Sequence, residues 1–267
     1  MSRERVSDTW ERWSAYEHYV GRWSRRVAPL FLTWLGIPPG RRWLDVGCGT
    51  GALCAAIADG CAPSSIDGVE PSEGFLGAAV ANLGGRARLQ WGVAEALPLP
   101  AESVDVVVSG LVLNFVPDQA AALAEMTRVV SNGGTIGAYV WDYAGKMELM
   151  RYFWDAAVEL DPDAAAFDEG PRFPLCDPEA LLQRFSGPAL SGTEVTAIDI
   201  PTPFASFDDY WQPFLGGQGV APAYAMSLDE PERLRIRDLL RSRLPVQSDG
   251  SIPLKARALA VRATVGS

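Results

Sequence analysis

Apolar residues recur at two different spacings along this chain, and the spacing changes from one segment to the next. In residues 104–108 they are almost continuous, which is typical of a strand buried on both faces of a sheet. In residues 118–130 they return every three or four positions, which predicts a helix with one buried face. On this basis we expect strands at residues 41–46, 65–70, 87–93, 104–108, 135–141, 193–200 and 256–265, and helices at residues 8–35, 52–59, 72–83, 118–130 and 146–160.

Cap and turn residues separate these elements. Ser72, Asp118 and Asp177 precede helical segments and are predicted to cap them, and Asn132-Gly133-Gly134 is predicted to end the fourth of these helices. Ser227-Leu228-Asp229-Glu230 has the pattern of a capping box opening a helix through Leu244. The regular alternation of strand and helix predicts an α/β fold, a doubly wound and mostly parallel sheet with helices on both faces.

Composition narrows the class of protein. The chain has 267 residues, 48% of them hydrophobic, which is enough for a sizeable core, and its net charge of −10 disfavours nucleic acid as a partner. Its four cysteines form no C-x-x-C pair and His18 is its one histidine, so no metal site is expected. No apolar stretch is long enough to span a membrane, and the polar N-terminus does not read as a signal peptide. We expect a cytoplasmic enzyme without a membrane partner.

The strongest candidate for chemistry follows the first predicted strand. Asp45 ends that strand, and Gly47, Gly49 and Gly51 then alternate, as a tight turn into a helix with a ligand close to the backbone requires. The same glycines fit the looser G-x-G-x-x-G/A pattern of dinucleotide sites, and Glu70 has a spacing suited to a ribose-binding acid in either case. A carboxylate at the strand tip repels a pyrophosphate but suits a ligand with an ammonium or sulfonium group. The acid therefore favours a cationic ligand, with NAD as the rival.

This segment resembles motif I of the class I S-adenosylmethionine (SAM) methyltransferases, in the small-molecule group related to the ubiquinone and menaquinone C-methyltransferases. Further segments match in family order over residues 10–141, among them Gly68-Val69-Glu70-Pro71-Ser72 and Glu125-Met126-Thr127-Arg128-Val129-Val130. The resemblance implies a Rossmann-like seven-stranded sheet of order 3-2-1-4-5-7-6. It also implies a single domain of residues 1–267, with an N-terminal helical lid at 8–36 and a helical cap insertion at 203–250 before the last strand.

The resemblance also implies which residues bind SAM, whose product is S-adenosylhomocysteine. In the family the acid at Glu70 accepts hydrogen bonds from both ribose hydroxyls. The family's adenine-binding turn usually has an aspartate where this chain has Val93, so adenine recognition would rely on the neighbouring residues. The predicted cofactor residues are Asp45, Gly47, Cys48, Gly49, Thr50, Gly51, Glu70, Pro71, Ser72, Phe75, Ala94, Glu95, Ala96, Ser109, Gly110 and Leu111, with Tyr16 and Arg22 from the lid.

The sequence identifies the site of the methyl acceptor less clearly than the cofactor site, because an activated methyl donor needs no fixed catalytic residue. Ligands of open α/β sheets bind at the carboxyl ends of strands, which directs attention to residues 139–143. Asp142 and His18 are the candidate acid–base residues. The candidate substrate contacts are Asn114, Tyr139, Trp141, Tyr143, Tyr210, Trp211, Phe214 and Tyr224, whose aromatic character suggests a small hydrophobic or planar acceptor.

Two functions follow from these residues. The first is methyl transfer to a small molecule by a monomer or homodimer. The second is a SAM-site protein that does not methylate, such as a cyclase, a decarboxylase or a ligand-sensing module on the same fold, since fold alone does not separate them. An NAD-dependent dehydrogenase ranks third.

Overall fold

The computed structural model describes residues 17–216 and 219–266, apart from the side chains of Glu17 and His18. The described chain divides into two compact units. We call residues 24–141, 174–198 and 258–266 the sheet unit, and residues 17–23, 142–173 and 199–257 the helical unit. The expected cap at 203–250 lies within the helical unit, while the limits of a single domain and of a lid at 8–36 stay predictions.

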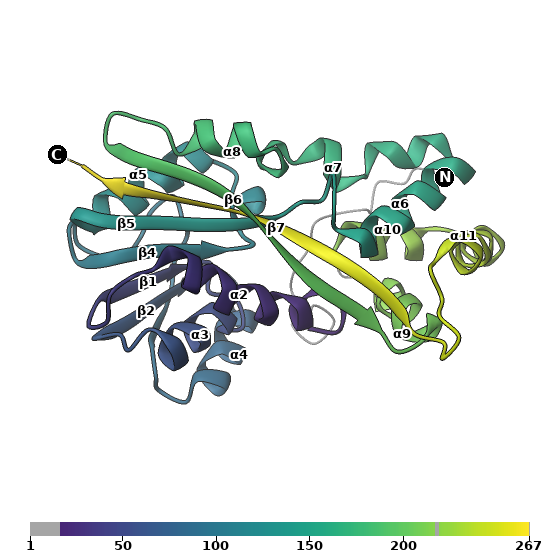
Figure 1. Ribbon diagram of the computed structural model, residues 1–267, viewed down its shortest axis with the longest axis horizontal. Helices are drawn as coiled ribbons and strands as arrows, with labels where there is room; N and C mark the ends of the chain where they lie inside the picture. Colours follow the sequence, from purple (N-terminus) through teal and green to yellow (C-terminus); the bar gives the residue numbers. More distant parts are fainter. Residues whose placement is uncertain (1–16, 217–218, 267) are drawn as a thin grey trace. The chain divides into compact units, whose positions relative to one another are not determined.

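A seven-stranded sheet organises the sheet unit, with the strand order β3-β2-β1-β4-β5-β7-β6 (Figure 1). Strands β1 to β5 pair in parallel, and β7 pairs antiparallel to β5, which confirms the predicted order and fold class. The strands are β1 (Arg42–Val46), β2 (Ser65–Glu70), β3 (Arg88–Trp91), β4 (Val104–Gly110), β5 (Val130–Trp141), β6 (Leu190–Phe204) and β7 (Ile252–Val265). The last two are longer than the expected 193–200 and 256–265.

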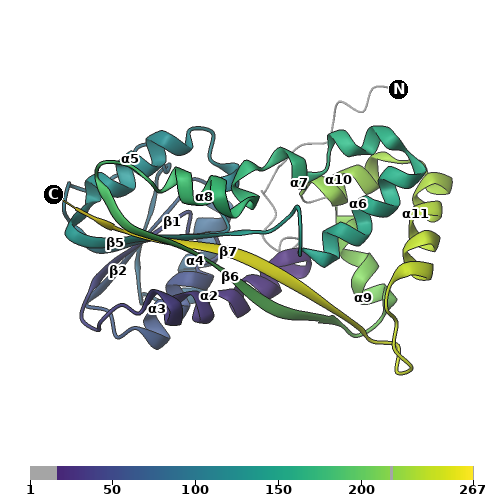
Figure 2. The same ribbon diagram turned by 45° about the horizontal axis from the view of Figure 1, so that its top comes forward.

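Helices cover both faces of the sheet. Helices α2, α3 and α4 lie on one face, and α5 and α8 lie on the other (Figures 1 and 2). Their bounds are α2 (Arg22–Leu35), α3 (Ala52–Gly60), α4 (Glu73–Leu83), α5 (Gln119–Val129) and α8 (Pro178–Arg184), with short 3-10 turns η2 (Leu113–Phe115) and η4 (Pro174–Cys176). The helix expected over residues 8–35 is described only from residue 17, where a π-helical turn η1 (Glu17–Gly21) precedes α2.

The core of the sheet unit forms where apolar helix faces meet the β-branched strands. Val107 and Ile136 are fully buried and belong to one cluster with Met126 of α5 and Phe185 after α8. Burying each such side chain contributes about 1.5–3 kcal/mol. On the α2 side the fit depends on Gly137, since a Cβ there would lie 2.9 Å from a methyl of Leu35. This packing fixes the strand ends from which the candidate site is built.

Most predicted caps are confirmed. The side chains of Ser72, Asp118 and Asp177 each accept backbone N–H groups at the start of their helices. The capping box near residue 230 is formed by Asp229 and Glu232 instead of Ser227 and Glu230. Ser227 is the last residue of the preceding helix and its hydroxyl donates to the Tyr224 carbonyl, so it is not available as a cap.

The predicted end of α5 is wrong in one respect. Strand β5 begins at Val130, so Asn132-Gly133-Gly134 lies inside the strand as an irregular segment and not as the closing turn. Val130 pairs with Val104, and the pairing resumes only at Thr135 and Val106. A Cβ on Gly134 would lie 2.6 Å from the Asp105 carbonyl oxygen, so a glycine permits this close approach.

The helical unit contains α6 (Glu148–Leu160), η3 (Pro162–Ala166), α7 (Glu169–Arg172), α9 (Phe207–Trp211), η5 (Gln212–Gly216), α10 (Val220–Ser227) and α11 (Glu230–Arg243). Helix α6 packs against α10 and α11 (Figure 2). Its buried face carries Phe153, which stacks on Phe214 at a centroid distance of 4.5 Å. The core of this unit is therefore largely aromatic.

Candidate functional site

The glycine loop between β1 and α3 adopts the backbone that its sequence predicts. Gly47, Gly49 and Gly51 have φ values of +73°, +55° and +85°, a region that side chains disfavour. A Cβ on Gly47 would lie 2.6 Å from the side chain of Val112, whereas one on Gly49 would meet nothing within 4 Å. The N–H groups of Gly47 and Cys48 donate to the Val69 carbonyl at 2.8 and 3.0 Å. The loop is therefore fixed at the carboxyl end of β2, with open space beside Gly49.

Glu70, the last residue of β2, holds this loop from the other side. Its Oε2 accepts the Gly49 N–H at 3.0 Å, and its Oε1 accepts the Ser72 N–H at 3.0 Å. Burial raises the pKa of the carboxyl, while the Ser72 and Gly49 N–H groups act in the opposite direction. Only 8% of the residue is exposed. One carboxylate thus connects the glycine loop to the start of α4.

Asp45 lies at the same strand end and is almost completely buried. Its Oδ2 accepts a hydrogen bond from the Cys54 thiol at 3.3 Å, whereas its Oδ1 is buried and has no partner. Burial raises the pKa of Asp45 to about 7, with a further increase from the charge of Glu70 and an opposing effect from the Cys54 thiol. No lysine or arginine in the described residues pairs with Asp45 or Glu70. Such an acidic, partly unsatisfied site favours a cationic ligand over a phosphate.

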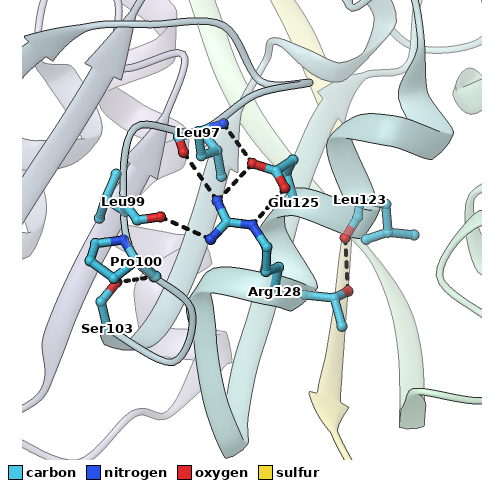
Figure 3. Close-up of polar contacts among 8 residues, drawn as sticks. Leu97, Leu99, Pro100, Ser103, Leu123, Glu125 and Arg128 are labelled. Carbon is cyan, nitrogen blue, oxygen red and sulfur yellow. Dashed lines mark hydrogen bonds and ion pairs between the residues drawn. The ribbon is translucent and has the colours of Figure 1, made fainter.

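The loop after β3, which contains the predicted adenine residues, is held to α5 by a second network (Figure 3). Arg128 donates to the carbonyls of Leu97 and Leu99 at 3.1 and 2.9 Å, and pairs with Glu125 at 2.6 Å. Glu125 in turn accepts the Leu97 N–H at 2.8 Å. Residues 97–99 therefore cannot move without breaking hydrogen bonds to charged groups. The sequence predicted this helix but gave no sign of its target in the loop.

We expect Arg128→Ala to lower the free energy of unfolding by about 2 kcal/mol, because two carbonyls and a carboxylate lose a charged donor. Urea unfolding of both proteins measures this effect. Arg237→Ala is the matched control, since among the described residues Arg237 pairs only with the exposed neighbour Asp238 and such pairs contribute about 0–1 kcal/mol. Equal losses in the two variants would show that the loop is not held by this network.

The structure also describes the other residues predicted to lie near the adenine and the ribose. Val93, at the position of the family aspartate, forms an isolated bridge with Ala96. Glu95 accepts the Asp118 N–H at 3.4 Å at the start of α5. Phe75 is buried in the first turn of α4, and Pro71 and Ala96 are exposed. The cofactor roles of Phe75, Ala94, Glu95 and Ala96 stay predictions.

The residue that follows β4 has a strained backbone conformation. Leu111 has φ +65°, which a leucine rarely adopts, and its N–H donates to the Tyr139 carbonyl at 2.7 Å. Such strain is found preferentially at functional sites. Ser109 is fully buried and donates to the Val46 carbonyl at 2.9 Å, so its side chain joins β4 to β1. A Cβ on Gly110 would lie 2.6 Å from the Tyr139 hydroxyl oxygen.

Asn114 follows on η2 and contacts a cysteine that is distant in sequence. Its Nδ2 lies 3.7 Å from the Cys176 Sγ, and the Cys176 thiol donates to the Trp141 carbonyl at 3.2 Å. The Asn114 Oδ1 is buried without a partner. Tyr139 and Trp141 are 2% and 1% exposed. Among the predicted substrate residues of the sheet unit, only Asn114 therefore presents an unsatisfied polar atom.

The other predicted residues lie in the helical unit or outside the described residues. Asp142 accepts the N–H groups of Gly145 and Lys146 at 2.8 and 3.1 Å, so its carboxylate already stabilises a turn. Tyr210 and Tyr224 donate to the Leu149 carbonyl and to Asp161. Tyr143, Tyr210, Trp211, Phe214 and Tyr224 are all buried. Tyr16 and the side chain of His18 fall outside the described part of the chain, and all these roles stay predictions.

No group of three or more histidine, cysteine, aspartate or glutamate residues in the described part of the chain is arranged to hold a metal ion. Within the same part of the chain, no helix has the length and apolar character needed to cross a bilayer.

Comparison with known proteins also indicates a methyltransferase domain. Residues 44–137 match a family model described as a methyltransferase domain. An uncharacterised protein of Mycobacterium bovis is 34% identical over 144 residues, covering 52% of this chain and 53% of that protein. The demethylmenaquinone methyltransferase of Bacillus licheniformis is 35% identical over 105 residues, covering 38% and 45%. The chain spans about half the length of these relatives.

Solved structures share the fold at low sequence identity. The YcgJ protein of Bacillus subtilis superposes with a TM-score of 0.58 at 16% identity, covering 91% of this chain and 99% of that chain. A phosphoethanolamine N-methyltransferase of Haemonchus contortus, solved with S-adenosylhomocysteine, gives 0.55 at 15% identity, covering 95% and 56%. The [4+2]-cyclase SpnF gives 0.55 at 18% identity, covering 91% and 82%.

The sheet order and the acidic glycine loop define a Rossmann-like methyltransferase fold. Residues 44–137 of this chain match the methyltransferase-domain family, and part of the chain is similar to the demethylmenaquinone methyltransferases.

Proposed function

We propose that this protein binds SAM in the sheet unit and transfers its methyl group to a small hydrophobic or aromatic molecule. The observation that carries the proposal is the buried carboxylate pair at the glycine loop, in which Asp45 Oδ1 has no partner. A buried carboxylate oxygen without a donor is costly unless a ligand supplies one. The ammonium group of SAM is such a donor, and the carboxylate of Glu70 would accept the ribose hydroxyls.

The residues present fit this cofactor in three ways. Gly49 leaves open space beside the loop, Glu70 holds two N–H groups in place, and Arg128 orders the loop that would face adenine. When bound, SAM supplies a methyl group activated by its sulfonium. The protein's part is then to position the acceptor and exclude water, which requires no obligatory acid or base.

The acceptor is proposed from two supports. The relatives include a demethylmenaquinone methyltransferase, and the sequence predicts substrate contacts at the aromatic residues Tyr210, Trp211 and Phe214. These favour a planar or apolar small molecule. The assignment as a monomer or homodimer in the cytoplasm stays a prediction.

Binding and turnover must be tested separately. We expect SAM to bind the full chain in calorimetry, and S-adenosylhomocysteine to be released when a panel of phenols, quinols and amines is supplied. Binding without turnover across the panel would favour the non-methylating alternative, to which the cyclase fold gives a precedent. Failure to bind SAM, with protection against melting by NADH, would contradict the proposal and favour a dehydrogenase.

A further inference from the structure

Cys54 of α3 contacts the carboxylate of Asp45, although the sequence gave this cysteine no role in the cofactor site. Its thiol donates to Asp45 Oδ2 at 3.3 Å, and Asp45 Oδ1 is buried without a partner. Both residues belong to the sheet unit, where Cys54 is 0% and Asp45 1% exposed. The other buried residues of α3, Leu53 and Ile57, are apolar. Cys54 therefore brings a polar group to an otherwise apolar helix face, at the end of β1.

This contact decides which oxygen of Asp45 is free. The terminal bond of an aspartate side chain has only a weak rotational preference, so its two oxygens are equivalent unless a donor holds one of them. Cys54 lies in the first turn of α3, where N–H groups lack partners within the helix, and the N-cap Gly51 offers no side chain to accept them. The Cys54 N–H also bonds to the Asp45 carboxylate. One residue thus holds the carboxylate with two donors.

The charged and titratable groups around this contact keep Cys54 a donor. A hydrogen bond with Cys48, burial and the charge of Asp45 raise the pKa of the Cys54 thiol well above its usual value. Burial and the charge of Glu70 raise the pKa of the Asp45 carboxyl to about 7, and the Cys54 thiol opposes them. The thiol is therefore protonated wherever Asp45 titrates, and it stabilises the carboxylate form.

We propose that Cys54 is a positioning residue of the cofactor site, whose thiol holds Asp45 Oδ2 and leaves Oδ1 for the ammonium group of SAM. The inference rests on the proposed function, because it takes SAM as the ligand. A carboxylate held in one orientation needs no reorganisation when the ligand arrives, which increases affinity. The cysteine itself does not touch the ligand and acts through Asp45.

Three variants of the full chain test this role. Cys54→Ala removes the side-chain donor, and Cys54→Ser keeps one in a side chain of nearly the same size. Cys61→Ala is the matched control, because Cys61 is a partly exposed free cysteine at the other end of the same helix. Carbon NMR of protein labelled at its aspartates measures the pKa of Asp45 without ligand, with Asp45→Asn to assign the resonance. Calorimetry measures SAM affinity between pH 6 and pH 8, and melting temperatures verify folding.

We expect Cys54→Ala to raise the pKa of Asp45 by about one pH unit, because the charged form loses a donor. The ionised fraction at pH 7 then falls from about one half to about one tenth, so SAM affinity at that pH falls about fivefold. Cys54→Ser and Cys61→Ala should stay close to the wild type in both measurements.

A cysteine that only fills space would change the melting temperature and leave the titration of Asp45 as it is. An unchanged pKa of Asp45 in a folded Cys54→Ala would therefore overturn the proposal, and so would a Cys54→Ser variant that behaves like Cys54→Ala. Failure of SAM to bind the wild type would contradict the proposed function, while the NMR titration still tests the action of Cys54 on Asp45.

Discussion

Replacing Glu70 by glutamine is expected to weaken SAM binding on the order of 100-fold, because hydrogen bonds to a charged group contribute about 1.5–3 kcal/mol each. The neutral amide can accept from one of the Gly49 and Ser72 N–H groups but points an N–H₂ group at the other. The glycine loop would then lose one of its two attachments. Titration calorimetry at pH 8 measures the loss.

Glu73→Gln is the matched control for this variant. Glu73 is exposed in the first turn of α4, three residues from Glu70. Its replacement by glutamine removes the same charge from the same region. We expect its SAM affinity to stay within about threefold of the wild type. If Glu70→Gln bound SAM as well as Glu73→Gln does, the cofactor site would not lie at the end of β2.

The second large effect is on the pH dependence of binding. Because burial raises the pKa of Asp45 to about 7, the carboxyl is protonated in the free protein below that pH. A cationic ligand binds the carboxylate form, so SAM affinity should rise about tenfold per pH unit up to pH 7 and then level off. Calorimetry in buffers of different ionisation enthalpy should detect release of a proton on binding at pH 6.

Asp45→Asn tests this interpretation directly. The asparagine does not titrate, so its SAM affinity is expected to be lower at pH 8 and to change much less between pH 6 and pH 8. A variant whose affinity follows the same steep pH profile as the wild type would show that another group, for example Glu70, is responsible.

The contribution of Asp45 to the free energy of unfolding of the ligand-free protein should fall as pH rises, whereas the affinity for SAM should increase. The folded pKa of Asp45 lies above the value of about 3.9 in the unfolded chain, so the folded state holds an extra proton between these values. The stability from this group is therefore present below pH 4 and is lost as pH rises toward 7. At pH 8, Asp45→Asn should unfold with a free energy on the order of 2–4 kcal/mol higher than the wild type, as urea denaturation would show.

Local sequence determined the helices, the strands and the turn of the glycine loop. Continuous β-branched residues predicted β4, the cap at Asp118 predicted the start of α5, and alternating glycines after Asp45 predicted the turn at the first strand end. These features depend on side-chain spacing and backbone conformation over a few neighbouring residues, so a single sequence is enough to predict them. The strand order came from resemblance to the methyltransferase family.

Tertiary structure decided which residues meet. Cys54 reaches Asp45, Arg128 reaches Leu97, and Arg22 pairs with Asp209 across 187 positions of sequence. Such contacts depend on how helices pack on strands, and no local pattern encodes them. The same packing left Asp45 Oδ1 and one edge of Arg22 without partners, and these unsatisfied atoms can be identified only after every other contact is known.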